Sequence, residues 1–494
     1  MPFTRRSFLI TAAGAAVAAA RKRGLALPFS VSSRQLADDI LRPQYHLLPA
    51  ANWMNDPDGP IYWKGQYHVF FQYNPNGAFW GDMHWAHAMS PDMVYWKHLP
   101  IALAPTRGGP DQDGCFSGSA VVDRDVATIV YTGVSPAPPD KATLVDGEHT
   151  FRETQCLATS TDPELRSWQK LPQPVIEAPP AGLKVTGFRD PCLWKDGDLW
   201  YLALGSGFPQ QGGAILLYRS PDLRRWSFVH PLYSGEWSGK PNPNPVDSGE
   251  MWECPDFFPL GNKYVLFYST ERKVYWMVGE YDAKELKFHP QTRGLLDSGD
   301  YYAPKSMLDH DGTRILWGWI PETRPLVEYK AAGWAGVMAL PRVLVVGDSG
   351  DLEMQVVPAL NSLRGKLRTD PNALYFPNFS AEFAATFLPS KGFAVSLGPE
   401  VRPYVKISYE PARQALTINE RRVPLSTSQG AKVKLELFMD GSVIEIFVAN
   451  RQAHTLRVYT LDGTSQNTPV RISGTLNEVR LWPMAPISND RLTT

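Results

Sequence analysis

Short runs of β-branched and aromatic residues recur along most of this chain, separated by Gly, Asn, Asp and Pro. Clear examples cover residues 65–73, 127–131 and 264–268. Such runs are typical of β-strands, because branched and aromatic side chains pack well on a pleated surface. The 3.6-residue spacing of apolar positions that marks an amphipathic helix is scarce. The pattern predicts an all-β protein.

A weak internal repeat organises the first two thirds of the chain. Each copy couples a turn, which begins with Ser-Pro-Asp or Thr-Asp-Pro in the three clear copies, to an outer strand that carries an aromatic residue. The three clear copies and one faded copy are Ser90–Pro100, Thr161–Pro172, Ser220–Pro231 and Tyr281–Phe288. Repeats of this kind are typical of the blades of a β-propeller.

The pattern changes after Pro341-Arg342, where a last strand gives way to a polar connector. Further on, residues 433–439 and 443–448 alternate between apolar and polar positions on either side of Asp440-Gly441. Alternation around an Asp-Gly pair predicts a β-hairpin with one buried face. A chain of 494 residues also exceeds the usual size of a single core, so we expect a second, C-terminal β domain.

The N-terminus is typical of an export signal rather than of a folded element. Arg5-Arg6 precedes an apolar, Ala-rich run from Phe8 to Ala20, and a short basic segment follows. The order of these parts resembles a twin-arginine signal, and the run is too short to cross a bilayer as a permanent helix. We therefore expect export to the periplasm or the medium, with no membrane attachment after the signal is removed.

Charge excludes two classes of partner. The 49 basic and 50 acidic residues give a net charge of −1, which provides no electrostatic footprint for nucleic acid or for an anionic membrane. The 16 Trp and 20 Tyr suit a neutral, hydroxyl-rich ligand, although many of them must belong to the core.

The cysteines and histidines predict no metal site. The four cysteines lie far apart and form no C-x-x-C pair, so we interpret them as buried thiols, and their even number leaves a disulfide open. His84 and His87 would face opposite sides of a strand.

Three acidic residues stand in motifs that restrict the backbone. Asp56 lies in Trp53–Pro60, Asp190 in Gly187–Pro191 and Glu253 in Met251–Asp256. Proline beside or near each acid limits its freedom, and a rigid carboxylate suits catalysis. Any one of them alone could be a turn cap or half of a buried salt bridge.

Together the three motifs resemble glycoside hydrolase family 32, whose β-fructofuranosidases carry W-M-N-D-P-N-G, R-D-P and E-C boxes in this order. The resemblance extends over nearly the whole mature chain. It continues through Phe71–Asn76, Phe79–Gly81, Phe116–Ser119, Tyr302–Lys305, Gly318-Trp319 and Trp334–Arg342.

The resemblance implies a five-bladed β-propeller, with the site in its axial funnel, followed by a C-terminal β-sandwich. The expected division is an export signal over 1–30, the propeller over 38–346, a connector over 347–370 and the sandwich over 371–494.

The resemblance also implies a retaining, exo-acting hydrolysis of terminal β-fructofuranosyl residues of sucrose or fructans, without cofactor or metal. Asp56 would be the nucleophile and Glu253 the acid and base, while Asp190 with Arg189 would hold ring hydroxyls. The remaining positions that match the family's fructose pocket are Asn55, Gln72, Trp80, Phe116, Ser117 and Trp319.

Two details of these motifs carry further expectations. Glu253 stands between Trp252 and Cys254, an apolar setting that would keep its carboxyl protonated while Asp56 stays ionised. Asp58 replaces the second Asn of the family box. We expect it to cap a turn, and if it instead faces the site it would affect the choice between water and sugar as acceptor.

Two other functions remain open from the sequence. A fructosyltransferase on the same scaffold would differ only in the hydroxyl group that it admits to the covalent intermediate. An inactive sugar-binding propeller would keep the aromatic residues but lose an acid, and the presence of Asp56, Asp190 and Glu253 argues against it.

Overall fold

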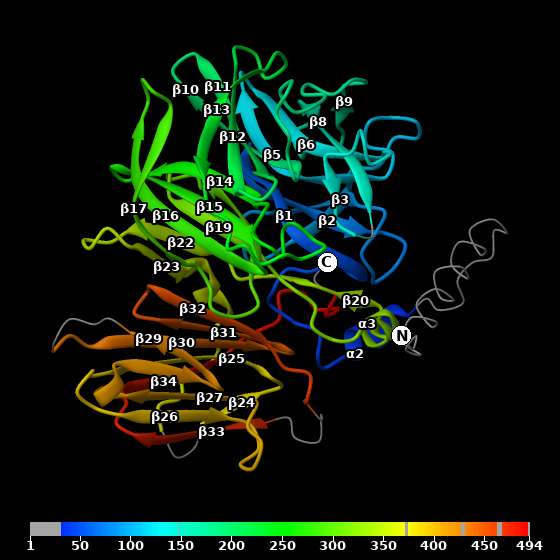
Figure 1. Ribbon diagram of the computed structural model, residues 1–494. Coiled ribbons are helices and arrows are strands. Elements are labelled where there is room, and N and C mark those ends of the chain that lie inside the picture. The colour runs from blue at the N-terminus through cyan, green and yellow to red at the C-terminus, as the bar shows by residue number, and fades with distance from the viewer. Residues whose placement is uncertain (1–30, 148, 371–373, 426–429, 462–466, 493–494) are drawn as a thin grey trace, which may run out of the picture.

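The computed structural model describes residues 31–147, 149–370, 374–425, 430–461 and 467–492 (Figure 1). The export signal predicted over residues 1–30 lies outside the described residues and stays a prediction. The described part is mostly strand, as the sequence predicted. Its helical segments are α2 (Ser33–Asp38), α3 (Leu326–Ala332), η1 (Pro358–Leu363) and η2 (Pro411–Arg413). None of these combines the length and apolar character that crossing a bilayer requires.

Five sheets of mainly antiparallel strands make up the larger part of the described chain. The first is β1 (Asn52–Trp63), β2 (Gln66–Asn74), β3 (His84–Ser90) and β4 (Lys97–Leu103), and the second is β5 (Gly114–Asp123), β6 (Val126–Pro136), β8 (Thr150–Ser160), β7 (Leu144–Val145) and β9 (Gln169–Lys170). The third is β10 (Phe188–Asp196), β11 (Leu199–Phe208), β12 (Gly212–Ser220) and β13 (Ser227–Ser234), and the fourth is β14 (Glu253–Leu260), β15 (Lys263–Thr270), β16 (Lys273–Asp282) and β17 (Lys287–Leu295). The fifth is β18 (Tyr302–Leu308), β19 (Arg314–Ile320), β22 (Arg342–Val346) and β23 (Leu352–Val356).

These sheets form a closed ring, which is the arrangement of a β-propeller. The first strands of the sheets, β1, β5, β10, β14 and β18, contact one another in cyclic order and surround the axis. Two short strands close the ring. β20 (Trp334–Ala335) pairs parallel with β1, and β21 (Val337–Met338) pairs with β19, so one segment joins the first sheet to the fifth.

Gly336 makes this closure sterically feasible. Its φ is +79°, and a Cβ built there would lie 2.0 Å from the carbonyl oxygen of Met54. Only glycine tolerates both this backbone conformation and this approach.

The five inner strands share one irregularity near their N-terminal ends. The pairing register between each inner strand and the next strand of its sheet shifts at this place. The shifts lie between Met54 and Pro57 in β1, Cys115 and Gly118 in β5, Arg189 and Cys192 in β10, Glu253 and Asp256 in β14, and Tyr302 and Lys305 in β18. A β-bulge of this kind bends the strand and redirects a side chain. In three strands the residue before proline has a left-handed φ, namely Asp190 (64°), Cys254 (47°) and Ala303 (50°). This unusual backbone is concentrated where the predicted acids lie.

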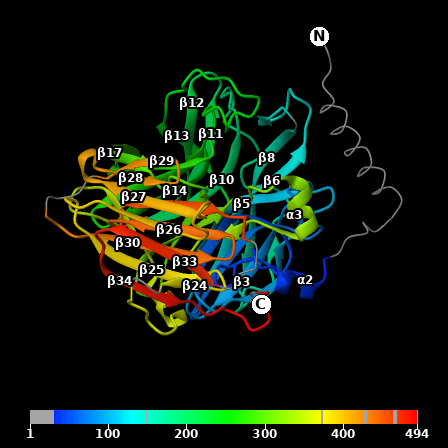
Figure 2. The same cartoon turned by 90° about the horizontal axis from the view of Figure 1, so that it is seen from below.

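The C-terminal part is a β-sandwich of two sheets, which Figure 2 shows from below in front of the propeller. One sheet contains β24 (Tyr375–Pro377), β33 (Asn467–Gly474), β26 (Phe393–Leu397), β27 (Val405–Glu410), β28 (Ala415–Ile418) and β29 (Arg421–Pro424). The other contains β32 (Gln452–Arg457), β31 (Val443–Val448), β30 (Val433–Asp440), β25 (Ser380–Phe387) and β34 (Asn477–Pro483). The hairpin predicted around Asp440-Gly441 is confirmed as β30 and β31. The stretch expected as a connector over 347–370 contains β23, which pairs with β22 and completes the fifth sheet.

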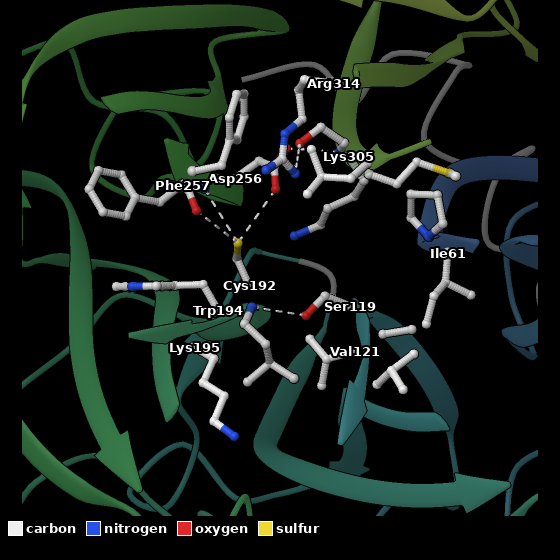
Figure 3. A pocket seen from close by; sticks show the side chains of 18 of the residues that line it. Ile61, Ser119, Val121, Cys192, Trp194, Lys195, Asp256, Phe257, Lys305 and Arg314 are labelled. Atoms are coloured by element: carbon white, nitrogen blue, oxygen red, sulfur yellow. Dashed lines mark hydrogen bonds between the residues drawn. The ribbon is translucent and has the colours of Figure 1, made fainter. Parts of the chain in front are cut away.

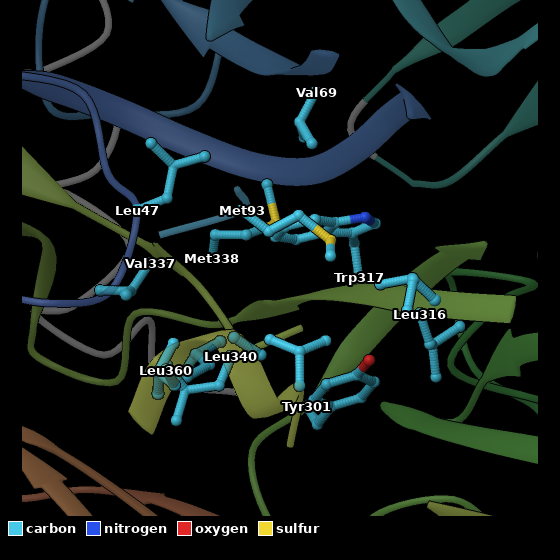
Figure 4. Close-up of a cluster of buried hydrophobic side chains, with 14 of the residues drawn as sticks. Leu47, Val69, Met93, Tyr301, Leu316, Trp317, Val337, Met338, Leu340 and Leu360 are labelled. Atoms are coloured by element: carbon cyan, nitrogen blue, oxygen red, sulfur yellow. The ribbon is translucent and has the colours of Figure 1, made fainter. Parts of the chain in front are cut away.

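One continuous apolar cluster joins the propeller to the sandwich. Trp317 of β19 is almost fully buried and meets Trp96 edge to face, with ring centroids 5.5 Å apart. Figure 4 shows Trp317 with Met93, Met338 and Leu340 in this cluster. Phe438 and Phe447 of the sandwich belong to the same cluster. The two parts therefore share a core as well as a covalent link.

A buried ionic network crosses the same interface. His46 Nδ1 lies 2.8 Å from Asp440 Oδ2, and His46 Nε2 lies 3.1 Å from Glu445 Oε1. Arg342 donates to Glu445 at 2.7 Å and to Asp297 at 3.0 Å. Burial disfavours the charged imidazole, but the two carboxylate contacts outweigh it and raise the pKa of His46 to about 9.

This network predicts that the protein loses stability at alkaline pH. Since the pKa of His46 is raised from 6.5 to about 9, its contribution is complete below pH 6.5 and is lost as the pH rises through about 9. We expect a loss of up to about 3 kcal/mol from this one group. His46→Gln should be less stable at pH 6 and should show a much shallower decline in thermal unfolding temperature between pH 6 and pH 10.

The exposed His289→Gln serves as the matched control and should follow the native profile. Parallel alkaline profiles for the native protein and His46→Gln would contradict this assignment.

Candidate active site

The N-terminal ends of the five inner strands bring functional side chains to one mouth of the propeller. Asp56, Ser117, Asp190, Glu253 and Tyr302 each come from a different inner strand, at or near the bulge. The structure thus brings together the three predicted acids, which are far apart in sequence. It also shows that Trp53–Pro60, where Asp58 was expected to cap a turn, lies within strand β1.

Asp56 is half-buried and is held by three donors. Ser117 Oγ donates to Oδ2 at 2.8 Å, Asn55 Nδ2 donates to Oδ1 at 3.1 Å, and the Cys254 thiol lies 3.4 Å from Oδ2. Asn55 is itself oriented, since Trp53 Nε1 donates to its Oδ1 at 2.7 Å. Burial and the charge of Glu253 raise the pKa of Asp56, and the three hydrogen bonds oppose that shift.

Asp190 is buried more deeply, at 3% exposure. The Cys254 backbone N–H donates to its Oδ2 at 3.0 Å, and the Cys254 thiol lies 3.4 Å from the same oxygen. Burial raises the pKa of Asp190 to about 7, against the opposing charge of Arg189. Cys254 thus contacts both aspartates. All four cysteines are free and buried, as the interpretation as buried thiols predicted.

Glu253 has a polar setting, so the apolar surroundings expected from its neighbours are wrong. Arg189 donates to its Oε1 from Nη2 at 2.6 Å and from Nε at 3.1 Å, and Tyr302 donates to its Oε2 at 2.8 Å. The Trp252 ring packs elsewhere, stacked on Tyr268 with centroids 3.8 Å apart. Adjacent residues of an extended chain face opposite sides, which removes Trp252 from the carboxyl group. The Glu253 side chain keeps 21% exposure.

Arg189 is anchored from behind by a residue that the sequence did not reveal. Glu153 is fully buried. Its carboxylate accepts hydrogen bonds from Arg189 Nη1 at 2.7 Å, from the Phe188 N–H at 2.7 Å and from the Thr143 hydroxyl group. The guanidinium group therefore donates to two carboxylates. Its predicted contact with sugar hydroxyls stays a prediction. No local pattern marks Glu153, whereas Tyr302 was signalled by its place before Ala303-Pro304.

Aromatic rings line the mouth beside the acids. Trp80 is 42% exposed and meets Phe116 edge to face at 5.9 Å. Trp319 lies 6.0 Å from Trp53 and 6.5 Å from Tyr302 between ring centroids. Among the described residues, the buried Trp319 Nε1 has no hydrogen-bond partner. Trp80, Phe116 and Trp319 thus lie at the mouth, and their predicted contact with a sugar ring stays a prediction.

Gln72 and Asp58 lie beneath this mouth as a buried pair. Gln72 Nε2 donates to Asp58 Oδ2 at 2.8 Å and to the Cys115 carbonyl at 2.9 Å, and the Gly118 N–H donates to Asp58 Oδ1 at 3.3 Å. Asp58 is fully buried, so the expectation that it caps a turn is wrong. It joins β1 to β2 and β5. Burial and the charge of Asp56 raise the pKa of Asp58 well above its ordinary range.

This geometry can perform acid–base and nucleophilic chemistry on a neutral ligand. Asp56 and Glu253 are both accessible to solvent, but their carboxyl groups have different partners. Asp56 is bonded by hydroxyl, amide and thiol groups, whereas Glu253 is bonded by guanidinium and phenol groups. A third, buried carboxyl group lies beside them, and aromatic rings bound the mouth. Sites that pair titratable groups in unlike environments are typical of catalysis.

Comparisons with known proteins agree with this geometry. The model of the Glycosyl hydrolases family 32 N-terminal domain matches residues 46–356, and that of the Glycosyl hydrolases family 32 C terminal matches residues 359–483. A sucrose-6-phosphate hydrolase of Escherichia coli is 35% identical over 83% of this chain and 87% of its own length.

Solved structures give the same result. A Bombyx mori GH32 beta-fructofuranosidase superposes with a TM-score of 0.77 and 30% identity, covering 91% of this chain and 95% of its own. Fructan 1-exohydrolase IIa from Cichorium intybus superposes with a TM-score of 0.73 and 25% identity, covering 90% of this chain and 98% of its own. With both family models covering nearly all of the described chain, the protein belongs to glycoside hydrolase family 32.

Proposed function

We propose that this protein is a retaining, exo-acting β-fructofuranosidase that hydrolyses terminal fructosyl residues of sucrose or fructans through a covalent fructosyl-enzyme. The observation that carries the proposal is the difference in setting between Asp56 and Glu253 at one mouth of the propeller. Relatives support the substrate class, since they include a raffinose invertase of Escherichia coli and a Bombyx mori beta-fructofuranosidase whose mutant was solved in complex with sucrose.

In the first step the Asp56 carboxylate attacks C2 of the fructosyl ring. The bond from C2 to the leaving oxygen breaks, its electron pair stays on that oxygen, and Glu253 supplies the proton. Ser117 and Asn55 hold the Asp56 oxygens in position. Arg189 and Tyr302 fix the Glu253 carboxyl from either side.

In the second step Glu253 takes a proton from water, whose oxygen attacks C2 and breaks the ester bond to Asp56. Two inversions at C2 give net retention. Asp190, anchored by the Cys254 N–H, accepts hydrogen bonds from ring hydroxyls that strengthen as the ring flattens in the transition state.

The two roles predict different responses of two variants. With a fructoside that carries an activated aryl leaving group, Glu253→Ala should form the fructosyl-enzyme quickly and hydrolyse it slowly, because little protonation is needed in the first step. Added azide should then release a fructosyl azide of retained configuration. Asp56→Ala should lose about 10⁴-fold or more in kcat and accumulate no ester.

Stopped-flow measurement of the aryl burst and mass spectrometry of the trapped ester are the readouts. Unchanged thermal unfolding temperatures for both variants are the control for folding. An ester on any residue other than Asp56, or an azide product of inverted configuration from Glu253→Ala, would refute the assignment.

The hydrogen bond from Ser117 predicts a shift in pH dependence. Asp56 must be ionised to attack, so kcat/KM falls as the pH drops through its raised pKa. The Ser117 bond lowers that pKa, so Ser117→Ala should move the acid limb to higher pH by about one unit. Ser119→Ala, which removes a hydroxyl group from the same strand away from Asp56, should leave the limb in place. A limb at the same pH in all three proteins would contradict this role of Ser117.

The buried position of Asp58 bears on the rival function, a fructosyltransferase. A carboxyl group that is bonded to Gln72 and Gly118 and closed off from solvent does not reach an acceptor sugar. We expect free fructose and glucose in a ratio near one in dilute sucrose, and some transfer product when sucrose is concentrated. Asp58→Asn should not change this ratio at any sucrose concentration. A ratio far below one in dilute sucrose would make the protein a transferase.

A further inference from the structure

A cavity lies at the opposite ends of the same inner strands that carry the acids. It has a volume of about 370 Å³ and is lined by residues late in β1, β5, β10, β14 and β18. On β10, for example, Asp190 stands near the beginning of the strand, whereas Trp194 and Lys195 line this cavity (Figure 3). The acids and this cavity therefore lie toward opposite ends of the inner strands.

Three cationic side chains line the cavity, Lys305 and Arg314 in its interior and Lys195 at its rim. Lys305 lies on the inner strand β18 and is only 1% exposed. Its ammonium group donates a hydrogen bond to the Pro255 carbonyl at 2.8 Å. Arg314 lies over the Phe258 ring at 4.5 Å, and its Nη1 reaches Ser306 Oγ only at 3.5 Å. Arg314 Nε is buried and has no hydrogen-bond partner among the described residues.

Asp256 is the carboxylate within this cavity, and its oxygens are already engaged. Cys192 Sγ lies 3.4 Å from Oδ1, and the Ser306 N–H donates to Oδ2 at 2.8 Å. This one carboxylate faces two interior cations, Lys305 and Arg314, so the interior keeps a net positive charge. At the rim, Lys195 is 3.7 Å from Asp123 and lies over the Trp200 ring.

We propose that this cavity is a second binding site, which takes a small oxyanion such as a phosphate or carboxylate group between Lys305 and Arg314. A buried cation with unused N–H groups is costly unless a partner satisfies it, and guanidinium and ammonium groups bind oxyanions through charge-assisted hydrogen bonds. The volume exceeds what the oxyanion alone needs. The aromatic and aliphatic walls around it, including Trp194, Phe257 and Ile61, leave room for an attached organic group.

The proposal is independent of the glycosidase assignment, because it concerns the far end of the axis. The mouth gathers the carboxyl groups of Asp56, Asp190, Glu253 and Glu153 around one cation, Arg189, which is already bonded to two of them and is not free for a second anion. Fructose should therefore not compete with the anion, which separates the two sites experimentally.

The test uses the full-length protein with inorganic phosphate and acetate as probes, at constant ionic strength kept with sodium chloride. We expect phosphate to raise the thermal unfolding temperature in a saturable way and to give a binding isotherm by calorimetry, unaffected by fructose. Arg314→Gln should weaken phosphate binding about tenfold or more. Arg224→Gln, which removes an exposed arginine outside the cavity, should bind phosphate as the native protein does.

A second variant keeps the test valid if Arg314→Gln fails to fold. Leu308 is 49% exposed at the rim, so Leu308→Glu should fold normally and weaken phosphate binding by repulsion. Acetate binding without phosphate binding would assign the site to carboxylates. No saturable effect of either anion beyond that of sodium chloride, or equal affinity in Arg314→Gln and the native protein, would overturn the proposal.

Discussion

The active site depends on one backbone constraint, the bulge that interrupts pairing near the start of every inner strand. A regular strand would alternate its side chains between the two faces of its sheet and present none of them along the propeller axis. A bulge redirects a side chain, and Asp56, Ser117, Asp190, Glu253 and Tyr302 each lie at or near one of these bulges. In three strands the bulge also holds a residue before proline in the left-handed region, with Asp190 and Cys254 among them. Local strain of this kind persists only where the surrounding structure enforces it, and here the closed ring does so.

The sequence predicts the strands and marks the three acids that the structure brings together, because each has a local cause; the catalytic roles of these acids stay predictions. Branched and aromatic runs define strands, and proline next to Asp56, Asp190 and Cys254 marks the bulges. The sequence predicts the surroundings of those residues poorly, because the side chains that contact them come from other strands. Glu253 is held by Arg189 and Tyr302, and Arg189 by Glu153, none of which adjoins Glu253 in sequence. Asp58 looked like a turn cap because Gly59 and Pro60 follow it, yet Gln72 and Gly118 draw it into the sheet.

The two domains are joined by polar as well as apolar contacts. Backbone N–H groups of Gln44, Tyr45 and His46 all donate to Asp440, which places the segment before β1 on the sandwich. Glu445 links His46, Arg342 and the Leu340 N–H. A buried network gains from its charges only when every member is satisfied, so loss of one partner weakens the others. The sandwich thus helps to hold the first and last sheets of the ring in place.

The parallel pairing of β20 with β1 has a consequence for synthesis of the protein on the ribosome. β1 carries Asp56, yet the pairs Asn52↔Trp334 and Trp53↔Ala335 require residues made much later. Until Trp334 emerges, the start of this edge of β1, at Asn52 and Trp53, stays unpaired, and an open strand edge is a template for association with other chains. Early translation products therefore contain Asp56 before all of its surrounding residues have been made. Fragments that end before Trp334 are vulnerable to aggregation. Pairing of β20 with β1 covers this part of the edge and joins the first sheet to the last.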